Sequence, residues 1–127
     1  MVAPTSNIPT IFVAFGATGD LMRRKVLPAL YYSYKHGELP KMFRVIGFSR
    51  REWSDDVFRT HVKEVLEEHV GAKIPEKELT PFLAVFQFQR GTFENVESYE
   101  ELKKTFDRND AEWGVCSNKL FYLSVAP

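Results

Sequence analysis

The chain has 127 residues, about the length of one globular domain, and we expect residues 1–127 to form a single domain. Of these residues 44% are hydrophobic, and 17 basic residues balance 17 acidic ones, which argues against a nucleic-acid partner. No apolar run is long enough to cross a bilayer and no signal-peptide pattern begins the chain, so we expect a cytoplasmic protein without a membrane partner.

The first predicted strand spans residues 11–15 (IFVAF), an uninterrupted apolar run that is typical of a strand buried on both faces. A helix follows, because apolar residues recur at every fourth position from Met22 to Tyr34 until Gly37 ends the pattern. Pro28 lies inside this helix and has no N–H to donate, so we expect a kink there.

The second predicted strand spans residues 44–49 (RVIGFS). The helix after it begins with Ser54 as N-cap, and Trp53 and Phe58 have the spacing of a hydrophobic staple. Apolar residues then recur at every fourth position from Phe58 to Val70, which predicts one buried face on this helix.

The third predicted strand spans residues 82–88 (FLAVFQF). We expect the next helix to begin at Ser98, with Glu101 completing a capping box. The fourth predicted strand spans residues 119–126 (KLFYLSVA) and nearly ends the chain. An apolar strand with an uncovered edge is an aggregation hazard, which suggests that the chain is part of a longer protein.

Strands thus alternate with helices along the whole chain. Because strand–helix–strand units are right-handed, this alternation predicts an α/β fold of the Rossmann type. We expect a doubly wound, mainly parallel sheet of strand order 3-2-1-4 between two layers of helices. A crevice should lie between the first and fourth strands, beside the turn that follows residue 15.

That turn has the sequence GATGD, from Gly16 to Asp20. A turn between a buried strand and a helix exposes backbone N–H groups at the positive end of the helix dipole, where an anion binds well. Gly16 allows a tight turn, and Gly19 has no Cβ to keep a phosphate away. Thr18 replaces the second glycine of the dinucleotide-binding pattern G-x-G-x-x-G, and no Gly-Lys pair of a Walker A loop follows.

The end of the second strand indicates which dinucleotide the chain binds. NAD-binding folds usually have Asp or Glu here for the ribose hydroxyls, whereas this chain has Ser49, Arg50 and Arg51. Two guanidinium groups at this point favour a 2′-phosphate, so we predict NADP as the coenzyme, with use of NAD as well left open.

These segments resemble the glucose-6-phosphate dehydrogenase family in its bacterial form. FGATGDLMRRKVLPALYYSYKHGELP, VIGFSRRE and NKLFYLSVAP are similar to the family's glycine loop and first helix, its second strand and its fourth strand. The resemblance covers residues 10–127. It implies a coenzyme site made of Gly16, Ala17, Thr18, Gly19, Asp20, Leu21, Arg50, Thr92 and Phe93, with Lys25 near the reaction centre.

The family oxidises glucose 6-phosphate to 6-phosphogluconolactone in the pentose phosphate pathway and transfers the hydride to NADP. Its catalytic histidine belongs to a β+α domain carrying a motif like RIDHYLGK, which this chain lacks. We therefore expect neither a catalytic residue nor a metal site here, and we expect the chain alone to bind coenzyme without turnover. The resemblance also implies a parent enzyme that is a homo-oligomer through the missing domain.

Two alternatives fit parts of the pattern. GATG also resembles the loop of extended short-chain reductases, but Met22 stands where their further glycine belongs. Their Tyr-x-x-x-Lys pair has a match in Tyr31 and Lys35, although on the first helix. The other alternative is a stand-alone module that responds to NADP and controls a partner through its fourth strand.

Overall fold

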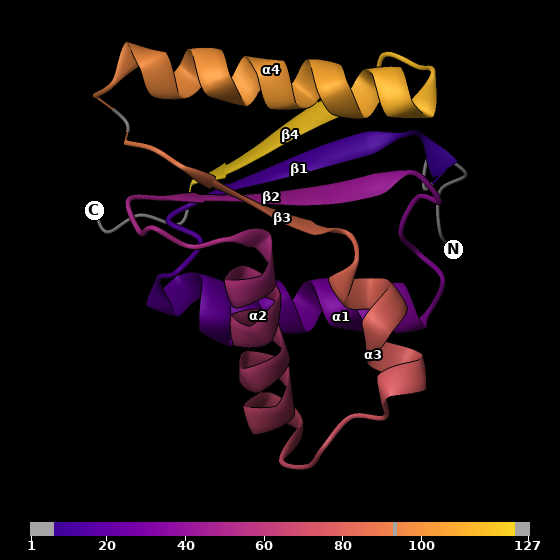
Figure 1. Cartoon of the computed structure of the whole chain (residues 1–127). Coiled ribbons are helices and arrows are strands. Elements are labelled where there is room, and N and C mark those ends of the chain that lie inside the picture. The colour runs from indigo at the N-terminus through magenta and orange to yellow at the C-terminus, as the bar shows by residue number, and fades with distance from the viewer. Residues whose placement is uncertain (1–6, 93, 124–127) are drawn as a thin grey trace.

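The computed structural model describes residues 7–92 and 94–123, which form a parallel sheet between helices (Figure 1). The elements are, in order, β1 (Thr10–Phe15), η2 (Met22–Val26), α1 (Leu27–Lys35), β2 (Phe43–Ser49), α2 (Asp55–Val70), α3 (Glu76–Leu83), β3 (Phe86–Arg90), α4 (Val96–Trp113) and β4 (Asn118–Leu123). The four strands of the described sheet lie in the order β3-β2-β1-β4 and are all parallel. The predicted α/β fold and its strand order are confirmed.

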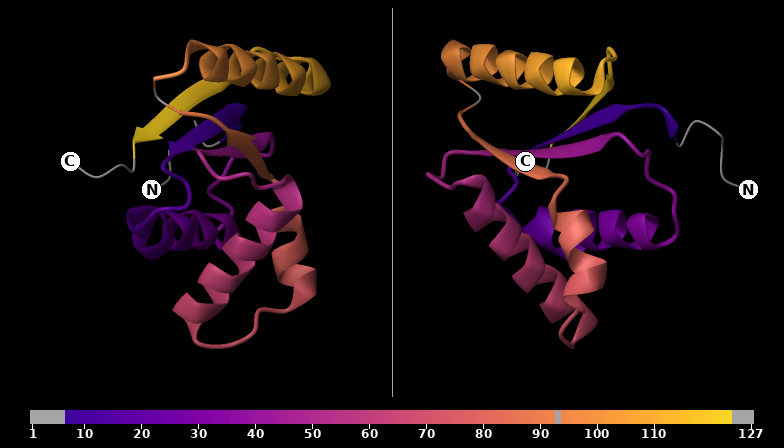
Figure 2. Two further views of the ribbon diagram at one scale, coloured as in Figure 1. Left: turned by 60° about the vertical axis from the view of Figure 1, so that its left-hand side comes forward. Right: turned by 45° about the vertical axis from the view of Figure 1, so that its right-hand side comes forward.

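The helices form two layers, with α1, α2 and α3 on one face of the sheet and α4 on the other (Figure 1); the views of Figure 2 show the same layers from two more sides. Each face has its own apolar core. The larger core lies under α1 to α3, and the smaller one packs Leu102 of α4 against β1 and β2. The central strands β1 and β2 are therefore buried on both faces, as their apolar runs predict.

The first helix is irregular next to Pro28. Residues 22–26 form a π-helical segment, in which the N–H of Leu27 donates to the carbonyl of Met22, five residues earlier, and α1 begins directly after it. Pro28 thus lies in the first turn of α1, where its missing N–H is tolerated. A π turn thus lies directly before Pro28, and the predicted kink itself stays a prediction.

The start of α2 has the predicted cap and staple. Ser54 Oγ accepts a hydrogen bond from the N–H of Val57 at 3.1 Å, and the rings of Trp53 and Phe58 lie 6.3 Å apart. Phe58 is fully buried, and a Cβ on Gly47 would lie 2.6 Å from its ring. The absence of a side chain at this position of β2 therefore makes room for α2. Val70 is exposed, so the buried face of α2 ends earlier than predicted.

The prediction of a strand over residues 82–88 is wrong at its beginning. Phe82 and Leu83 end α3, and the strand begins only at Phe86. Pro75 precedes the helix, and acidic residues in its first turn favour a helix start. A short apolar run fits a buried helix end as well as a strand, and here the helix takes its first two residues.

The predicted start of the last helix is also wrong. Asn95 is the N-cap of α4, and its Oδ1 accepts the N–H of Glu97 at 2.9 Å. Ser98 lies inside the first turn and is buried. Its Oγ accepts the N–H of Thr92 at 3.2 Å, so this hydroxyl holds the loop after β3 instead of capping the helix.

The strand β4 has exposed apolar side chains. Leu120 is 48% exposed, Phe121 56% and Leu123 62%, and alternate positions of a strand point to opposite faces. The predicted residues 124–126 of this strand lie outside the described residues. Apolar groups on both faces of an edge strand favour pairing with another chain.

We expect the purified 127-residue chain to self-associate as its concentration rises. The variant Leu123→Lys should reduce the association, whereas Val96→Lys, which changes an exposed residue of α4, should leave it unchanged. Light scattering over a concentration series measures both. A concentration-independent monomer up to millimolar protein would contradict this expectation.

Candidate functional site

The loops after β1, β2 and β3 meet at one edge of the sheet, where parallel strands have their carboxyl ends. They enclose a cavity of about 330 Å³ lined by Gly16, Thr18, Phe48, Ser49, Arg50, Arg51, Gly91 and Thr92. Ligands of open α/β sheets bind outside the carboxyl ends of the strands. The cavity joins the predicted glycine turn to the predicted arginine, two features that are separate in the sequence.

The turn after β1 is fixed by backbone hydrogen bonds. Gly16 has a φ of +76°, a conformation that favours glycine, and its N–H donates to the carbonyl of Phe48 at 3.0 Å. The N–H of Gly19 donates back to the carbonyl of Gly16 at 2.9 Å. Among the described residues the N–H of Thr18 has no acceptor, and the helical stretch that leads into η2 begins at Asp20. The turn thus presents donors next to a helix N-terminus, which suits an anion.

The other predicted residues of the turn have different surroundings. Ala17 is fully buried in the core below the turn, whereas Leu21 is exposed. Asp20 is exposed and its carboxylate pairs with Arg23 at 2.7 Å and Arg24 at 2.8 Å. The hydrogen bond from Arg23 keeps the pKa of Asp20 below its usual value.

Lys25, the residue that the resemblance puts near the reaction centre, is exposed in η2. It does not line the cavity that the three loops enclose.

The three arginines near the ends of β2 and β3 differ in their partners. Arg51 lies over the ring of Trp53 at 5.5 Å, and Arg90 pairs with Glu52 at 2.9 Å. Within the described part of the chain, the guanidinium of Arg50 has neither an ion pair nor a hydrogen bond. Arg50 is therefore the arginine of the three whose guanidinium contacts neither a carboxylate nor a ring among the described residues.

The loop after β3 adds a residue that the sequence did not predict. Gly91 lines the cavity, and a Cβ on it would lie 2.4 Å from the ring of Phe48 and 2.8 Å from Ser98. A glycine directly after a strand is the available signal, since it often marks a close approach. Thr92, which the resemblance assigns to the coenzyme site, lines the cavity, whereas Phe93 lies outside the described residues.

Side chains that could have served other chemistry lie elsewhere. The hydroxyl of Tyr31 donates to Glu78 at 2.7 Å, and burial raises the pKa of Tyr31 to about 12. Lys35 pairs with the same carboxylate at 3.2 Å, so this Tyr–Lys pair joins α1 to α3. His61 packs against Trp53, and burial lowers its pKa. No histidine lines the cavity of the three loops as far as the structure describes it.

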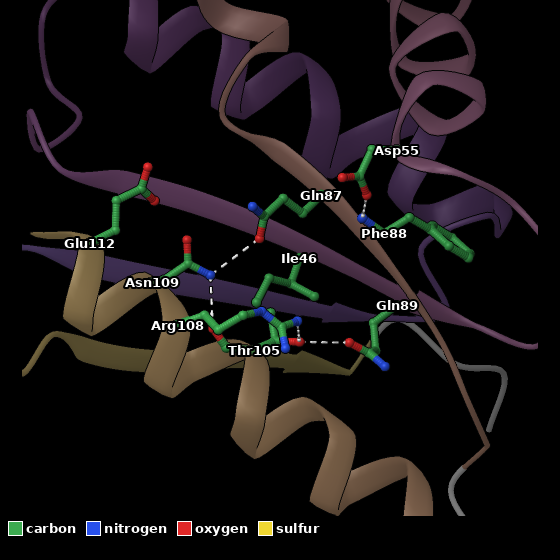
Figure 3. Close-up of a pocket in the computed structure, with 9 residues that line it drawn as sticks. All are labelled: Ile46, Asp55, Gln87, Phe88, Gln89, Thr105, Arg108, Asn109 and Glu112. Atoms are coloured by element: carbon green, nitrogen blue, oxygen red, sulfur yellow. Dashed lines mark hydrogen bonds between the residues drawn. The ribbon is translucent and has the colours of Figure 1, made fainter.

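A second cavity, of about 360 Å³, lies between α4 and the edge strand β3 (Figure 3). Its polar groups pair with one another: Asn109 donates to Gln87, Thr105 donates to Gln89, and Asp55 accepts the N–H of Phe88. These bonds join the helices to the outer strand of the sheet. The cavity is separate from the three loops, and several of its polar groups bond one another across the contact between the helices and β3, so we assign it a structural role.

Comparison with known proteins decides the family. The family model described as "Glucose-6-phosphate dehydrogenase, NAD binding domain" matches residues 13–127. The chain belongs to this family. In this NAD-binding domain, the glycine turn and Arg50 line one cavity at the carboxyl ends of the strands.

Relatives of this NAD-binding domain are several times longer. It is 38% identical over 125 residues to a glucose-6-phosphate 1-dehydrogenase of Chlamydia pneumoniae, covering 98% of this chain and 24% of the relative. It is 37% identical to glucose-6-phosphate 1-dehydrogenase 2 of Mycobacterium bovis, covering 94% of this chain and 23% of the relative. The chain thus spans about a quarter of these proteins.

A solved structure of glucose-6-phosphate dehydrogenase in complex with its substrate glucose 6-phosphate has the same fold. It superposes with a TM-score of 0.85 at 34% identity, covering 99% of this domain and 26% of that chain. The enzyme of Mycobacterium avium shares the fold with a TM-score of 0.76. In the described ranges of the domain, no helix has the length and apolar character of a membrane span.

Proposed function

We propose that this domain binds NADP and is the coenzyme-binding part of an enzyme that oxidises glucose 6-phosphate to 6-phosphogluconolactone. The observation that carries the proposal is the cavity that both the Gly16–Thr18 turn and Arg50 line. The turn suits the pyrophosphate shared by both coenzymes, and Arg50 suits the 2′-phosphate that distinguishes NADP from NAD.

The residues at this edge of the sheet fit such a ligand in charge and in space. The N–H of Thr18, which has no acceptor among the described residues, and the first helical turn would hold the pyrophosphate. Gly91, without a Cβ, lets the loop after β3 pack directly on Phe48 and Ser98 at the cavity wall. Arg50 would pair with the 2′-phosphate. When bound, the nicotinamide ring accepts the hydride from the sugar. The family implies that the rest of the enzyme is a cytoplasmic homo-oligomer and supplies both the sugar-phosphate site and the base.

Calorimetric titration of the 127-residue chain with NADP, and then with NAD, tests the coenzyme proposal. We expect saturable binding of both coenzymes. The affinity for NADP should be roughly tenfold higher or more, which corresponds to one charge-assisted hydrogen bond. Equal affinity for the two coenzymes would contradict the assignment of NADP, and absence of binding would contradict the site.

We also expect the isolated chain to have no dehydrogenase activity. Hydride transfer needs the sugar and a base positioned against the coenzyme, and no histidine lies in the described cavity. Absorbance at the NADPH band, followed with glucose 6-phosphate and NADP, measures this directly. Production of NADPH by chain free of contaminating enzyme would show that a catalytic group is present here.

A further inference from the structure

Arg90, the last residue of β3, contacts the loop that carries Arg50. Its Nε donates to the backbone carbonyl of Arg50 at 3.0 Å, and another nitrogen of the same guanidinium lies 2.9 Å from a carboxylate oxygen of Glu52. One planar side chain therefore binds two residues of a loop that is 40 positions earlier in the sequence.

The direction of the Arg50 side chain depends on this backbone. In the described residues its guanidinium has no polar partner, so the backbone is the part of Arg50 that a neighbouring side chain holds. The next residue is fixed independently, because the N–H of Arg51 donates to Ser49 Oγ at 3.1 Å. The carbonyl of Arg50 is held by Arg90, at the end of the neighbouring strand β3.

Arg50 and Arg90 also line a third cavity, which shares Arg50, Gly91 and Thr92 with the cavity of the three loops. This cavity of about 420 Å³ is lined by Arg50, Arg90, Gly91, Thr92, Asn95 and Ser98. Glu52 pairs with Arg90, whereas neither Arg50 nor Arg51 has an ion pair among the described residues, and Arg51 lies over the ring of Trp53. The arrangement suits Arg90 for holding its neighbour rather than for binding the anion itself.

We propose that Arg90 is a positioning residue that makes the domain selective for NADP by holding Arg50 toward the 2′-phosphate. This inference rests on the proposed function, because it requires the 2′-phosphate to bind Arg50. Arg90 acts through its forked geometry, since one guanidinium reaches both a carbonyl and a carboxylate. A lysine has a similar charge but no fork, so it should not replace Arg90.

The test is a set of calorimetric titrations of the 127-residue chain with NADP, NAD, 2′,5′-ADP and 5′-AMP. We expect Arg90→Ala and Arg90→Lys each to weaken binding of NADP and 2′,5′-ADP roughly three- to tenfold, with little change for NAD and 5′-AMP. Lys103→Ala, which removes an exposed cation of α4 with no ion pair or side-chain hydrogen bond among the described residues, is the control and should change none of these affinities.

The double variant Arg50→Ala/Arg90→Ala distinguishes positioning from direct contact. If Arg90 acts through Arg50, the double variant binds NADP no more weakly than Arg50→Ala alone. Additive losses would overturn the positioning role, as would full rescue by Arg90→Lys. If Arg50→Ala lowers the preference for NADP and Arg90→Ala does not, this inference is wrong and the proposed function stands. If the unmodified chain binds NADP and NAD equally, the proposed function fails first.

Discussion

The variant Arg50→Ala should bind NADP about ten- to hundredfold more weakly than the unmodified domain, with nearly unchanged affinity for NAD. A hydrogen bond to a charged group contributes roughly 1.5–3 kcal/mol, and only NADP has a phosphate at this point. Arg50 lines the cavity with the glycine turn and has no competing partner in the described structure. Calorimetric titration with each coenzyme measures the two affinities separately.

Arg51→Ala is the matched control, because it removes the same charge one residue later. The Arg51 guanidinium lies over Trp53, so its loss should affect NADP binding much less. If Arg50→Ala weakened NADP and NAD equally, or weakened neither, the assignment of Arg50 would be wrong. A large loss in Arg51→Ala instead would move the 2′-phosphate site by one residue.

The largest expected effect on stability comes from Phe58→Ala. Phe58 is fully buried, and its ring lies 5.8 Å from that of Phe86 and 5.3 Å from that of Phe88, so it joins α2 to β3. Removing a buried phenylalanine side chain costs about 3–5 kcal/mol of unfolding free energy. Urea unfolding measures the loss, and Val57→Ala, at an exposed position of the same helix, should cost far less.

A second substitution shows whether the cost arises at the contact with the sheet. Gly47→Ala should destabilise the domain by about 1–3 kcal/mol, because the new Cβ would overlap the Phe58 ring. In the Phe58→Ala background that cost should largely disappear, since the cavity accepts the methyl group. Additive losses, or a loss below about 1 kcal/mol in Phe58→Ala, would show that this packing is not what holds α2.

Local sequence signals were sufficient for much of the fold. The runs at residues 11–15 and 44–49 are strands because both faces are buried, and Ser54 with Trp53 marks the start of α2. The errors arose where two local signals competed. Residues 82–83 belong to a helix although they continue an apolar run, and Asn95 caps α4 although Ser98 and Glu101 have the spacing of a capping box.

The candidate site divides into a local part, which the sequence indicates, and a non-local part, which it does not. The turn from Gly16 to Gly19 is local, so its tight geometry follows from two glycines next to a strand. The partners of the arginines are not local. Arg51 could be separated from Arg50 only after Trp53 was placed, and the bond from Arg90 to the Arg50 carbonyl joins residues 40 positions apart. No spacing rule for one segment predicts such a contact.

A crystal structure of the 127-residue domain with NADP tests the proposed coenzyme site most directly. We expect the pyrophosphate on the N–H groups of the turn, including that of Thr18, and the 2′-phosphate within hydrogen-bonding distance of the Arg50 guanidinium. A 2′-phosphate bound away from Arg50, or a coenzyme bound in the cavity between α4 and β3, would contradict the proposed site.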